Sequence, residues 1–310
     1  RVKIITPSRS YKNNFLSKVF FKIWTFYYIR STCNKIEPTS LLSFNERYNN
    51  IVLLSLLGTK FNKYVSDRNN PYINIGKLHT RLRNLLYRRA TGIIAQTSTA
   101  KKELHKNTKN TNIRVIPNPL RKIEDTKIKD LSNKIILNVG RNVPQKNQLE
   151  LLEIFSKCDF SGWTLQIIGN GPLKDVLIQK SVELGISNNV QIFDFSKDID
   201  SFYREASIFA FSSLYEGFPN ALNEAMAHGL ACVSFDCPTG PKDIIKDGYN
   251  GMLVDLGNRD SFQQKMNELM LSEKLREQFS AKAIESKDIY SLNKITDNYL
   301  NFILNDEVNN

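Results

Sequence analysis

The fold of this chain is decided by residues 212–229, which read SSLYEGFPNALNEAMAHG. The apolar run Ala206–Phe211 before them is rich in β-favouring residues, and this predicts a buried strand of a parallel sheet. Apolar residues then recur at helical spacing, with Pro219 expected in the first turn of the helix and Gly229 expected to end it in a left-handed conformation. The stretch therefore predicts a strand, a glycine-containing turn and a helix.

Such a turn lies at the carboxyl edge of a parallel sheet, where free backbone N–H groups and the helix dipole attract an anion. Glu216 lies in the turn and Glu224 about two helical turns later. Carboxylates repel phosphate but accept hydrogen bonds from paired hydroxyl groups. We therefore expect the turn amides to bind a phosphate and the two glutamates to bind sugar hydroxyls. The alternative is that neither glutamate binds a ligand: Glu216 would be an acid at the helix start and Glu224 a solvated helix residue.

The surrounding residues favour the first alternative, because the stretch resembles the Glu-x7-Glu motif of a known enzyme family. This family is the retaining, GT-B-fold glycosyltransferases of family four, the glycogen-synthase-like glycosyl transferases group 1. The resemblance covers Ile135 to Val254. Besides residues 212–229, it rests on Ile135–Arg141 with Gln145–Asn147, on Gly169–Pro172, on Cys237–Pro241, and on Asp247-Gly248 with Asn250-Gly251.

The resemblance implies an α/β fold with two doubly wound, Rossmann-like domains that face each other across a cleft. We expect residues 1–130 to form the acceptor-side domain and residues 131–310 the nucleotide-sugar domain, with Arg121 to Asn133 as the linker. The last helix, near Tyr299, is expected to cross back onto the first domain. The first domain lacks the family's opening βα unit and glycine-rich loop, and the chain begins without methionine, which suggests a truncated start.

Strand-like and helix-like segments alternate throughout the chain, which predicts parallel sheets. Helices are expected over Asn14–Lys35, Asn49–Leu57, Gly76–Ala90 and from Thr97, and after Ser261. Strands are expected at 1–6, 40–44, 63–66, 92–96, 113–116, 134–140, 163–169, 190–195, 208–211 and 231–235.

On the family pattern, Arg141 and Lys146 converge on the diphosphate of a sugar nucleotide. Two cations there neutralise the charge that develops on the leaving group. Without their flanking residues, they would read as two solvated surface cations. Glu216 is expected to bind the transferred sugar and Glu224 the ribose. The remaining expected contacts are the phosphate-binding turn, Gly217, Phe218, Pro219, Asn220 and Ala221, and the nucleobase region, Asp194 and Phe195.

Two positions depart from the family. Arg68 stands where many members have a histidine, and an arginine cannot act as a general base at neutral pH. It could instead pair with a phosphate or with the acceptor, so we expect Arg68, together with Glu216, to be a catalytic residue. Asp194 stands where a glycine is usual. His79, His105 and His228 match no catalytic position and are expected to be structural or solvated.

Composition excludes several classes of protein. The chain has 310 residues, of which 41% are hydrophobic, so it is long enough for two folded domains. Its longest apolar runs are too short to cross a bilayer. Four scattered cysteines form no CxxC pair, which argues against a disulfide scaffold or a zinc site and favours reduced thiols in the cytoplasm. No metal or other cofactor is expected, because the sequence offers no cluster of histidines as ligands.

The positive charge is concentrated in the first domain. Residues 1–130 carry 26 Lys+Arg and 7 Asp+Glu, whereas the rest of the chain has a net charge of −7. No nucleic-acid motif accompanies this charge. Segment Lys12–Lys35 interleaves basic and aromatic residues, which suits the surface of an anionic membrane, although core packing explains the aromatic residues equally well.

These observations lead to one hypothesis and two competitors. The hypothesis is a retaining hexosyltransferase at the cytoplasmic face of the membrane. It moves a hexose or N-acetylhexosamine from a nucleotide sugar, expected to be a uridine diphosphate sugar, to a lipid-linked or cell-surface glycan. The competitors are a sugar-nucleotide epimerase of the same fold and an inactive, basic membrane- or nucleic-acid-binding relative.

Overall fold

The computed structural model describes residues 14–72, 76–123 and 130–304, which form two compact units. The first unit contains most of the chain up to Val115 together with the end of the last helix, and the second contains Gln96–Ala100 and Ile116–Tyr299. The second unit thus begins earlier than the boundary expected at residue 131. The strand expected at 1–6 lies outside the described residues.

The described part of the first unit contains a parallel sheet in the order β1-β2-β3-β4. Its strands are β1 (Ser40–Phe44), β2 (Asn62–Ser66), β3 (Gly92–Ala95) and β4 (Ile113–Val115), and its helices are α1 (Phe15–Ile36), α2 (Glu46–Ser55), α3 (Lys77–Tyr87) and α4 (Ser98–Thr108). Helix α2 starts three residues before its predicted start, because the Asn45 side chain accepts from the amide of Arg47 and caps it. At its other end, Arg30 of α1 donates to the carbonyls of Ser55 and Leu57.

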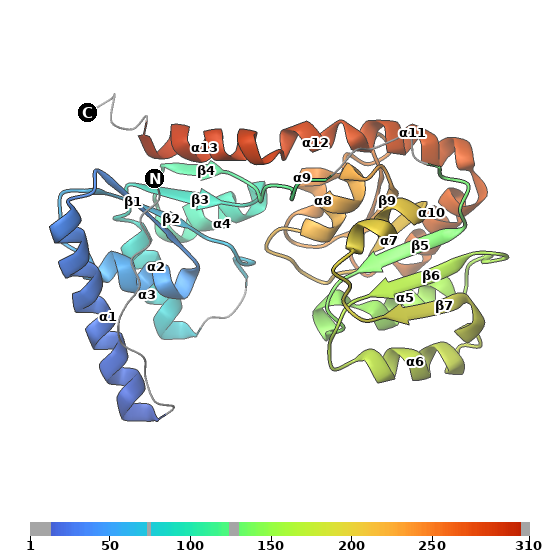
Figure 1. Ribbon diagram of the computed structural model, residues 1–310, viewed down its shortest axis with the longest axis horizontal. Helices are drawn as coiled ribbons and strands as arrows, with labels where there is room; N and C mark the ends of the chain where they lie inside the picture. The colour runs from blue at the N-terminus through green and yellow to red at the C-terminus, as the bar shows by residue number, and fades with distance from the viewer. Residues whose placement is uncertain (1–13, 73–75, 124–129, 305–310) are drawn as a thin grey trace. The chain divides into compact units, whose positions relative to one another are not determined.

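The second unit has a parallel sheet in the order β10-β9-β8-β5-β6-β7 (Figure 1). Its strands are β5 (Ile135–Val139), β6 (Thr164–Ile168), β7 (Val190–Phe193), β8 (Ile208–Phe211), β9 (Ala231–Asp236) and β10 (Met252–Asp255). The sequence analysis did not predict β10, since its four residues carry only a weak strand signal after the turn at Asp247-Gly248. Strand β7 is shorter than predicted, because the amide of Phe195 donates to the side chain of Asn170 and to no neighbouring strand.

Helices cover both faces of this sheet. They are α5 (Gln148–Phe155), α6 (Lys174–Glu183), α7 (Ile199–Glu205), α8 (Asn220–Ala227), α9 (Pro241–Ile244), α10 (Arg259–Leu271), α11 (Glu273–Ile284), α12 (Ser286–Ile289) and α13 (Leu292–Leu304), with short 3-10 turns at Pro144–Lys146 and Ser187–Asn189. Successive residues of β5 enter different cores: Ile136 lies in the core that contains Phe155 of α5, and Leu137 lies in the core that contains Leu222 of α8. This is the doubly wound arrangement, in which strands are buried on both faces.

The last helix belongs to both units. Its residues up to Tyr299 group with the second unit, and Leu300–Leu304 group with the first. Within the first unit, the ring of Phe302 lies edge-on against Tyr64, with ring centroids 5.4 Å apart.

Candidate active site

The strand order of the second unit changes direction at β5, which has β6 on one side and β8 on the other. Ligands of doubly wound sheets bind at this switch point, outside the carboxyl ends of the strands. The loops that leave β5 and β8 contain Arg141, Lys146 and Glu216. The topology therefore places these predicted residues at the sheet edge where a ligand is expected.

Three hydrogen bonds to backbone carbonyls join the two loops. The hydroxyl of Ser212 donates to the carbonyl of Lys146 at 2.8 Å, and the amide of Leu214 donates to the carbonyl of Gln145 at 2.9 Å. The side-chain amide of Gln145 donates to the carbonyl of Tyr215 at 2.7 Å. These bonds hold residues 145–146 against residues 212–215 and so fix the position of Lys146.

Lys146 and Glu216 form an ion pair, with 2.6 Å between Nζ and Oε1. The two side chains are only 16% and 9% exposed, so water screens the pair weakly. Gln145 Nε2 lies 3.4 Å from the other oxygen of Glu216, and Thr239 donates to the Glu216 carbonyl. The sequence placed Lys146 on the diphosphate and Glu216 on the sugar; the structure brings both side chains to one point.

The turn after Glu216 offers free backbone donors. Within the described chain, the amides of Gly217, Phe218 and Ala221 have no hydrogen-bond partner, whereas the amide of Asn220 donates to the Phe218 carbonyl. Pro219 is the N-cap of α8 and does not occupy its first turn as predicted; having no N–H, it contributes no amide to the expected phosphate-binding turn. Three donors beside a helix start are suited to an anion.

Arg141 follows β5 and is exposed. Its guanidinium makes no hydrogen bond or ion pair with any residue that the structure describes. The two predicted phosphate ligands therefore differ: Lys146 is paired with Glu216, whereas the Arg141 guanidinium is free to bind a phosphate.

Glu224 lies on α8 and is 23% exposed. Burial raises the pKa of its carboxyl group, while Arg121 and the Tyr203 hydroxyl oppose this shift. Arg121 Nε lies 3.5 Å from Glu224 Oε2. Arg121 lies in the predicted linker, and no local pattern marks it as a site residue, because its partners Asp200 and Glu224 lie 79 and 103 positions away.

The predicted nucleobase region follows β7. Asp194 is 68% exposed and pairs with Lys174 at 2.7 Å, and the Phe195 side chain is also exposed. Phe195 thus presents an aromatic ring beside a charged pair.

Arg68 lies in the first unit, directly after Asp67 at the carboxyl end of β2. Its guanidinium carbon is 5.5 Å from the centre of the Phe44 ring, and its amide donates to Glu46 at 3.1 Å. The catalytic role expected for Arg68 remains a prediction.

The other reactive side chains of the described chain lack the features of catalytic groups. Burial raises the pKa of the Cys158 and Cys237 thiols to about 12, so neither is a thiolate at neutral pH. His228 is buried, as one alternative for it predicted, whereas His79 and His105 are exposed. No group of three or more metal-ligating side chains occurs among the described residues.

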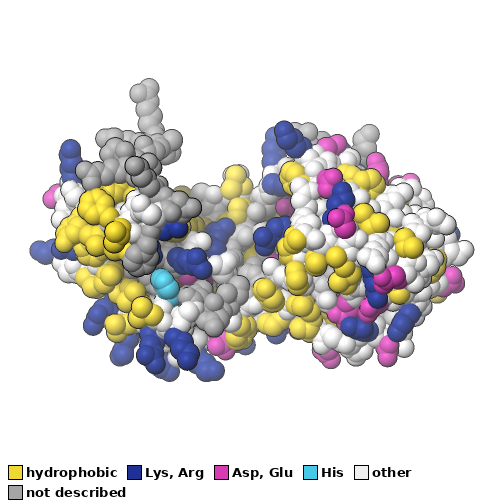
Figure 2. Space-filling model, turned by 90° about the horizontal axis from the view of Figure 1, so that it is seen from below, with side chains coloured by type: hydrophobic (Ala, Val, Ile, Leu, Met, Phe, Trp, Pro, Cys, Tyr) yellow, Lys and Arg dark blue, Asp and Glu magenta, His cyan; other side chains and the backbone are white. Residues whose placement is uncertain are grey.

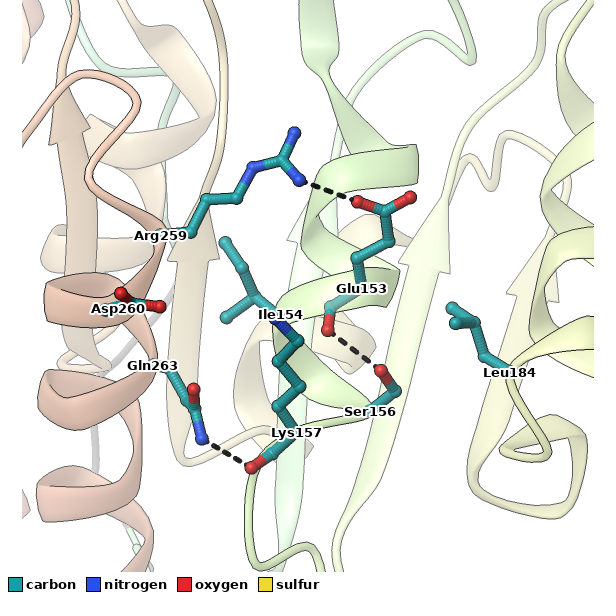
Figure 3. Close-up of a pocket in the computed structure, with 8 residues that line it drawn as sticks. All are labelled: Glu153, Ile154, Ser156, Lys157, Leu184, Arg259, Asp260 and Gln263. Carbon is teal, nitrogen blue, oxygen red and sulfur yellow. Dashed lines mark hydrogen bonds and ion pairs between the residues drawn. The ribbon is translucent and has the colours of Figure 1, made fainter.

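A separate pocket of about 210 Å³ lies between α5 and α10 (Figure 3). Its Arg259 is held by ion pairs to Glu150 and Glu153, at 2.7 and 2.9 Å. It is formed by the helices that cover the sheet, and none of the predicted site residues lines it.

Known proteins are similar to this chain. A family model described as "Glycosyl transferases group 1" matches residues 121–286, more than half of the chain. The amylovoran biosynthesis glycosyltransferase AmsD of Erwinia amylovora is 37% identical over 155 residues, which are 50% of this chain and 44% of AmsD.

A second relative is the N-acetylgalactosamine-N,N'-diacetylbacillosaminyl-diphospho-undecaprenol 4-alpha-N-acetylgalactosaminyltransferase of Campylobacter jejuni. It is 31% identical, over 59% of this chain and 49% of that protein. The chain thus spans about half the length of these two relatives.

Among solved structures, TarM of S. aureus, in a complex containing UDP, superposes with a TM-score of 0.77. It is 22% identical, and the match covers 89% of this chain and 58% of TarM. This likeness confirms the predicted α/β fold with two Rossmann-like units.

Proposed function

Because the chain belongs to the glycosyl transferases group 1 family, we propose that it transfers a hexose or N-acetylhexosamine from a UDP-sugar, with retention, to a lipid-linked or cell-surface glycan. The observation that carries this proposal is the Lys146–Glu216 pair at the switch point, next to three free amides. A relative named for a diphospho-undecaprenol glycan supports the acceptor class, and the UDP in the TarM complex supports the donor.

The site performs this transfer by binding the two halves of the donor separately. The free amides of Gly217, Phe218 and Ala221 and the Arg141 guanidinium donate to the diphosphate, while Glu216 accepts from hydroxyls of the transferred sugar. As the glycosidic bond breaks, negative charge grows on the diphosphate, and Lys146 moves from Glu216 toward it. The Glu216 carboxylate then faces the positive, oxocarbenium-like sugar. The acceptor hydroxyl bonds to the anomeric carbon, its proton passes to an oxygen of the departing diphosphate, and UDP leaves. No metal ion is needed for this charge balance.

Thermal unfolding against a panel of nucleotide sugars tests the donor. A ligand that binds only the folded state raises the melting temperature, and we expect UDP and UDP-sugars to do so more than guanosine or adenosine analogues. The anomeric configuration of the product, determined by NMR, tests retention. No shift with any nucleotide sugar would contradict the proposal and would favour an inactive relative.

We further propose that α1 attaches the protein to the cytoplasmic face of an anionic membrane. A stripe on α1 comprises Leu16, Phe20, Ile23 and Tyr27, which are 53–78% exposed, and Lys18 and Lys22 are exposed beside it. Helix α1 contains no acidic residue. On the face shown in Figure 2, hydrophobic and basic side chains gather on the first unit, at the left. No described helix is long and apolar enough to span a bilayer.

The sequence left two roles open for the aromatic residues of α1, which are contact with a membrane and packing inside the protein. Trp24 and Tyr28 are half-buried and stack on each other within α1, with centroids 4.9 Å apart, whereas Phe20 and Tyr27 are exposed. Replacing Lys18 and Lys22 with glutamine should reduce binding to anionic vesicles, as should salt that brings the Debye length below about 8 Å. Arg30 caps α2 and is unsuitable for this test. Glutamine at the exposed Lys101 and Lys102 of α4 is the control; equal loss there, or salt-independent binding, would contradict attachment through α1.

A further inference from the structure

Arg121 lies between two carboxylates of the second unit. Its Nη1 donates to Asp200 at 2.7 Å, and Nη2 donates to the other oxygen of the same carboxylate. Its Nε faces Glu224 Oε2 at 3.5 Å. A planar guanidinium held on two N–H groups by one acid has a fixed orientation, so Asp200 determines where the third N–H points.

The contacts continue from Asp200 and return to Glu224. His228 Nε2 lies 2.9 Å from Asp200 Oδ1, and His228 Nδ1 lies 2.8 Å from the backbone carbonyl of Glu224. The imidazole is stacked on the Tyr203 ring, at 4.8 Å and 18°. Glu224 is therefore held at its backbone by His228 and at its carboxylate by Arg121.

The charge of Glu224 depends on this surrounding. Burial disfavours the ionised form of Glu224 and so raises the pKa of its carboxyl group. Arg121 is the group that opposes this rise most strongly. The other groups facing it are Tyr203 and Asp200, and burial lowers the pKa of the adjacent His228. An ionised carboxylate accepts hydrogen bonds on both oxygens, whereas protonation turns one oxygen into a donor and weakens the binding of two hydroxyl groups.

We propose that Arg121, oriented by Asp200, is a positioning residue that holds the Glu224 carboxylate in the orientation and charge state that bind the ribose diol of the donor. This inference rests on the proposed function. The Nε–Oε2 contact uses one oxygen of Glu224 from one side, and the partial exposure of the side chain leaves part of the carboxylate for the ligand. Arg121 thus acts on the nucleotide through Glu224.

A double-mutant cycle with UDP tests this, with affinity measured by titration calorimetry. Arg121→Ala and Glu224→Gln should each weaken UDP binding by about tenfold, the scale of one charge-assisted hydrogen bond. The double variant should bind no more weakly than Glu224→Gln alone, because Arg121 has nothing left to position. Additive losses would mean that Arg121 contacts the nucleotide itself and would overturn the inference.

The pH profile separates positioning from general damage to the fold. Without Arg121, the pKa of Glu224 rises further, so the affinity of Arg121→Ala relative to wild type should fall as the pH is lowered from 8 toward about 6. Taking the ratio at each pH cancels the titration of the UDP phosphate. Arg121→Lys keeps the charge and should restore a flat ratio, although it cannot bind Asp200 through two N–H groups. A flat profile for Arg121→Ala would contradict the inference.

Arg259→Ala is the matched control, since Arg259 also joins two carboxylates of the second unit, Glu150 and Glu153, and contacts none of Arg121, Asp200 and Glu224. Figure 3 shows its pair with Glu153. It should leave UDP affinity unchanged. If wild type itself binds no UDP, the proposed function fails; if wild type and Arg121→Ala bind equally while Glu224→Gln is weakened, only the role of Arg121 fails.

Discussion

Asp67 and Glu216 both lie at the carboxyl ends of parallel strands, yet their surroundings differ. Asp67 follows β2 directly, is 4% exposed and faces Glu46, with Arg83 at 3.8 Å. Burial, followed by Glu46, raises its pKa well above the usual range. Glu216 follows β8, pairs with a lysine of the neighbouring loop at 2.6 Å and adjoins three free amides. Around Asp67, the charged groups and donors contact one another, so we call Asp67, Glu46 and Arg83 the closed site. The turn after Glu216 retains free donors for a ligand, so we call Arg141, Lys146, Glu216 and Glu224 the open site.

The largest expected effect is on the cations of the open site. Lys146→Ala and Arg141→Ala should each lower turnover by about a hundredfold or more, since each removes a charge that stabilises the leaving diphosphate. Only Lys146→Ala should also lower the melting temperature, because it leaves the buried Glu216 carboxylate without its partner. Steady-state kinetics and thermal unfolding check both. Unchanged turnover in both variants would remove them from the site.

The two glutamates of the open site should differ in the step they affect. Glu224→Gln should raise KM and weaken UDP binding by about tenfold, because ribose contacts change little between ground and transition state. Glu216→Gln should bind UDP normally yet lower kcat, because it faces the sugar as positive charge develops. Calorimetry with UDP and single-turnover transfer rates distinguish them; the opposite pattern would reverse the two roles.

The turn after Glu216 depends on a glycine that packs against it. Gly240 has φ +105°, and a Cβ there would overlap the Pro219 ring. Gly240→Ala should therefore displace the start of α8, lowering both the melting temperature and UDP affinity. Gly248 has φ +72° but open space around it, so Gly248→Ala should cost only the strain of a left-handed residue, about 1 kcal/mol. Equal effects on UDP affinity would show that the Pro219 contact is unimportant.

The smallest expected effect is at the closed site and depends on pH. A carboxyl group with a raised folded-state pKa stabilises the protein fully below its unfolded pKa, and this contribution is lost as pH rises through the folded pKa. Asp67→Asn mimics the protonated acid, so it should remove this loss and flatten the stability profile above about pH 4. Glu46 contributes in the opposite direction: burial raises its pKa, but the neighbouring Asp67 and the hydrogen bonds that Asn69 donates outweigh this and lower it.

Urea unfolding of the full chain at several pH values checks this prediction. An Asp67→Asn profile parallel to that of wild type would mean that Asp67 is ionised in the folded protein, and the contrast with Glu216 would then be lost.

Local patterns predicted most of the fold. Helix α1 was predicted to within one residue at each end, β1 and β8 have their predicted bounds, and Gly229 ends α8 at φ +75°. These features depend on neighbours a few positions away, which a sequence displays directly. The start of α2 was misplaced because its cap, Asn45, has an unusual positive φ.

The sequence by itself determined the alternation of strands and helices and the positions of the motif residues, because apolar periodicity and turn residues act over short distances. Only the tertiary structure decided which of those residues meet. Lys146 pairs with Glu216, 70 positions away, because β5 and β8 are neighbours in the sheet, and strand order leaves no periodic signal. The Arg121–Asp200–His228 contacts around Glu224 have the same origin, because each joins segments that are far apart in the sequence. The tertiary packing also buries Glu224 and so raises the pKa of its carboxyl group, a shift that Arg121 opposes.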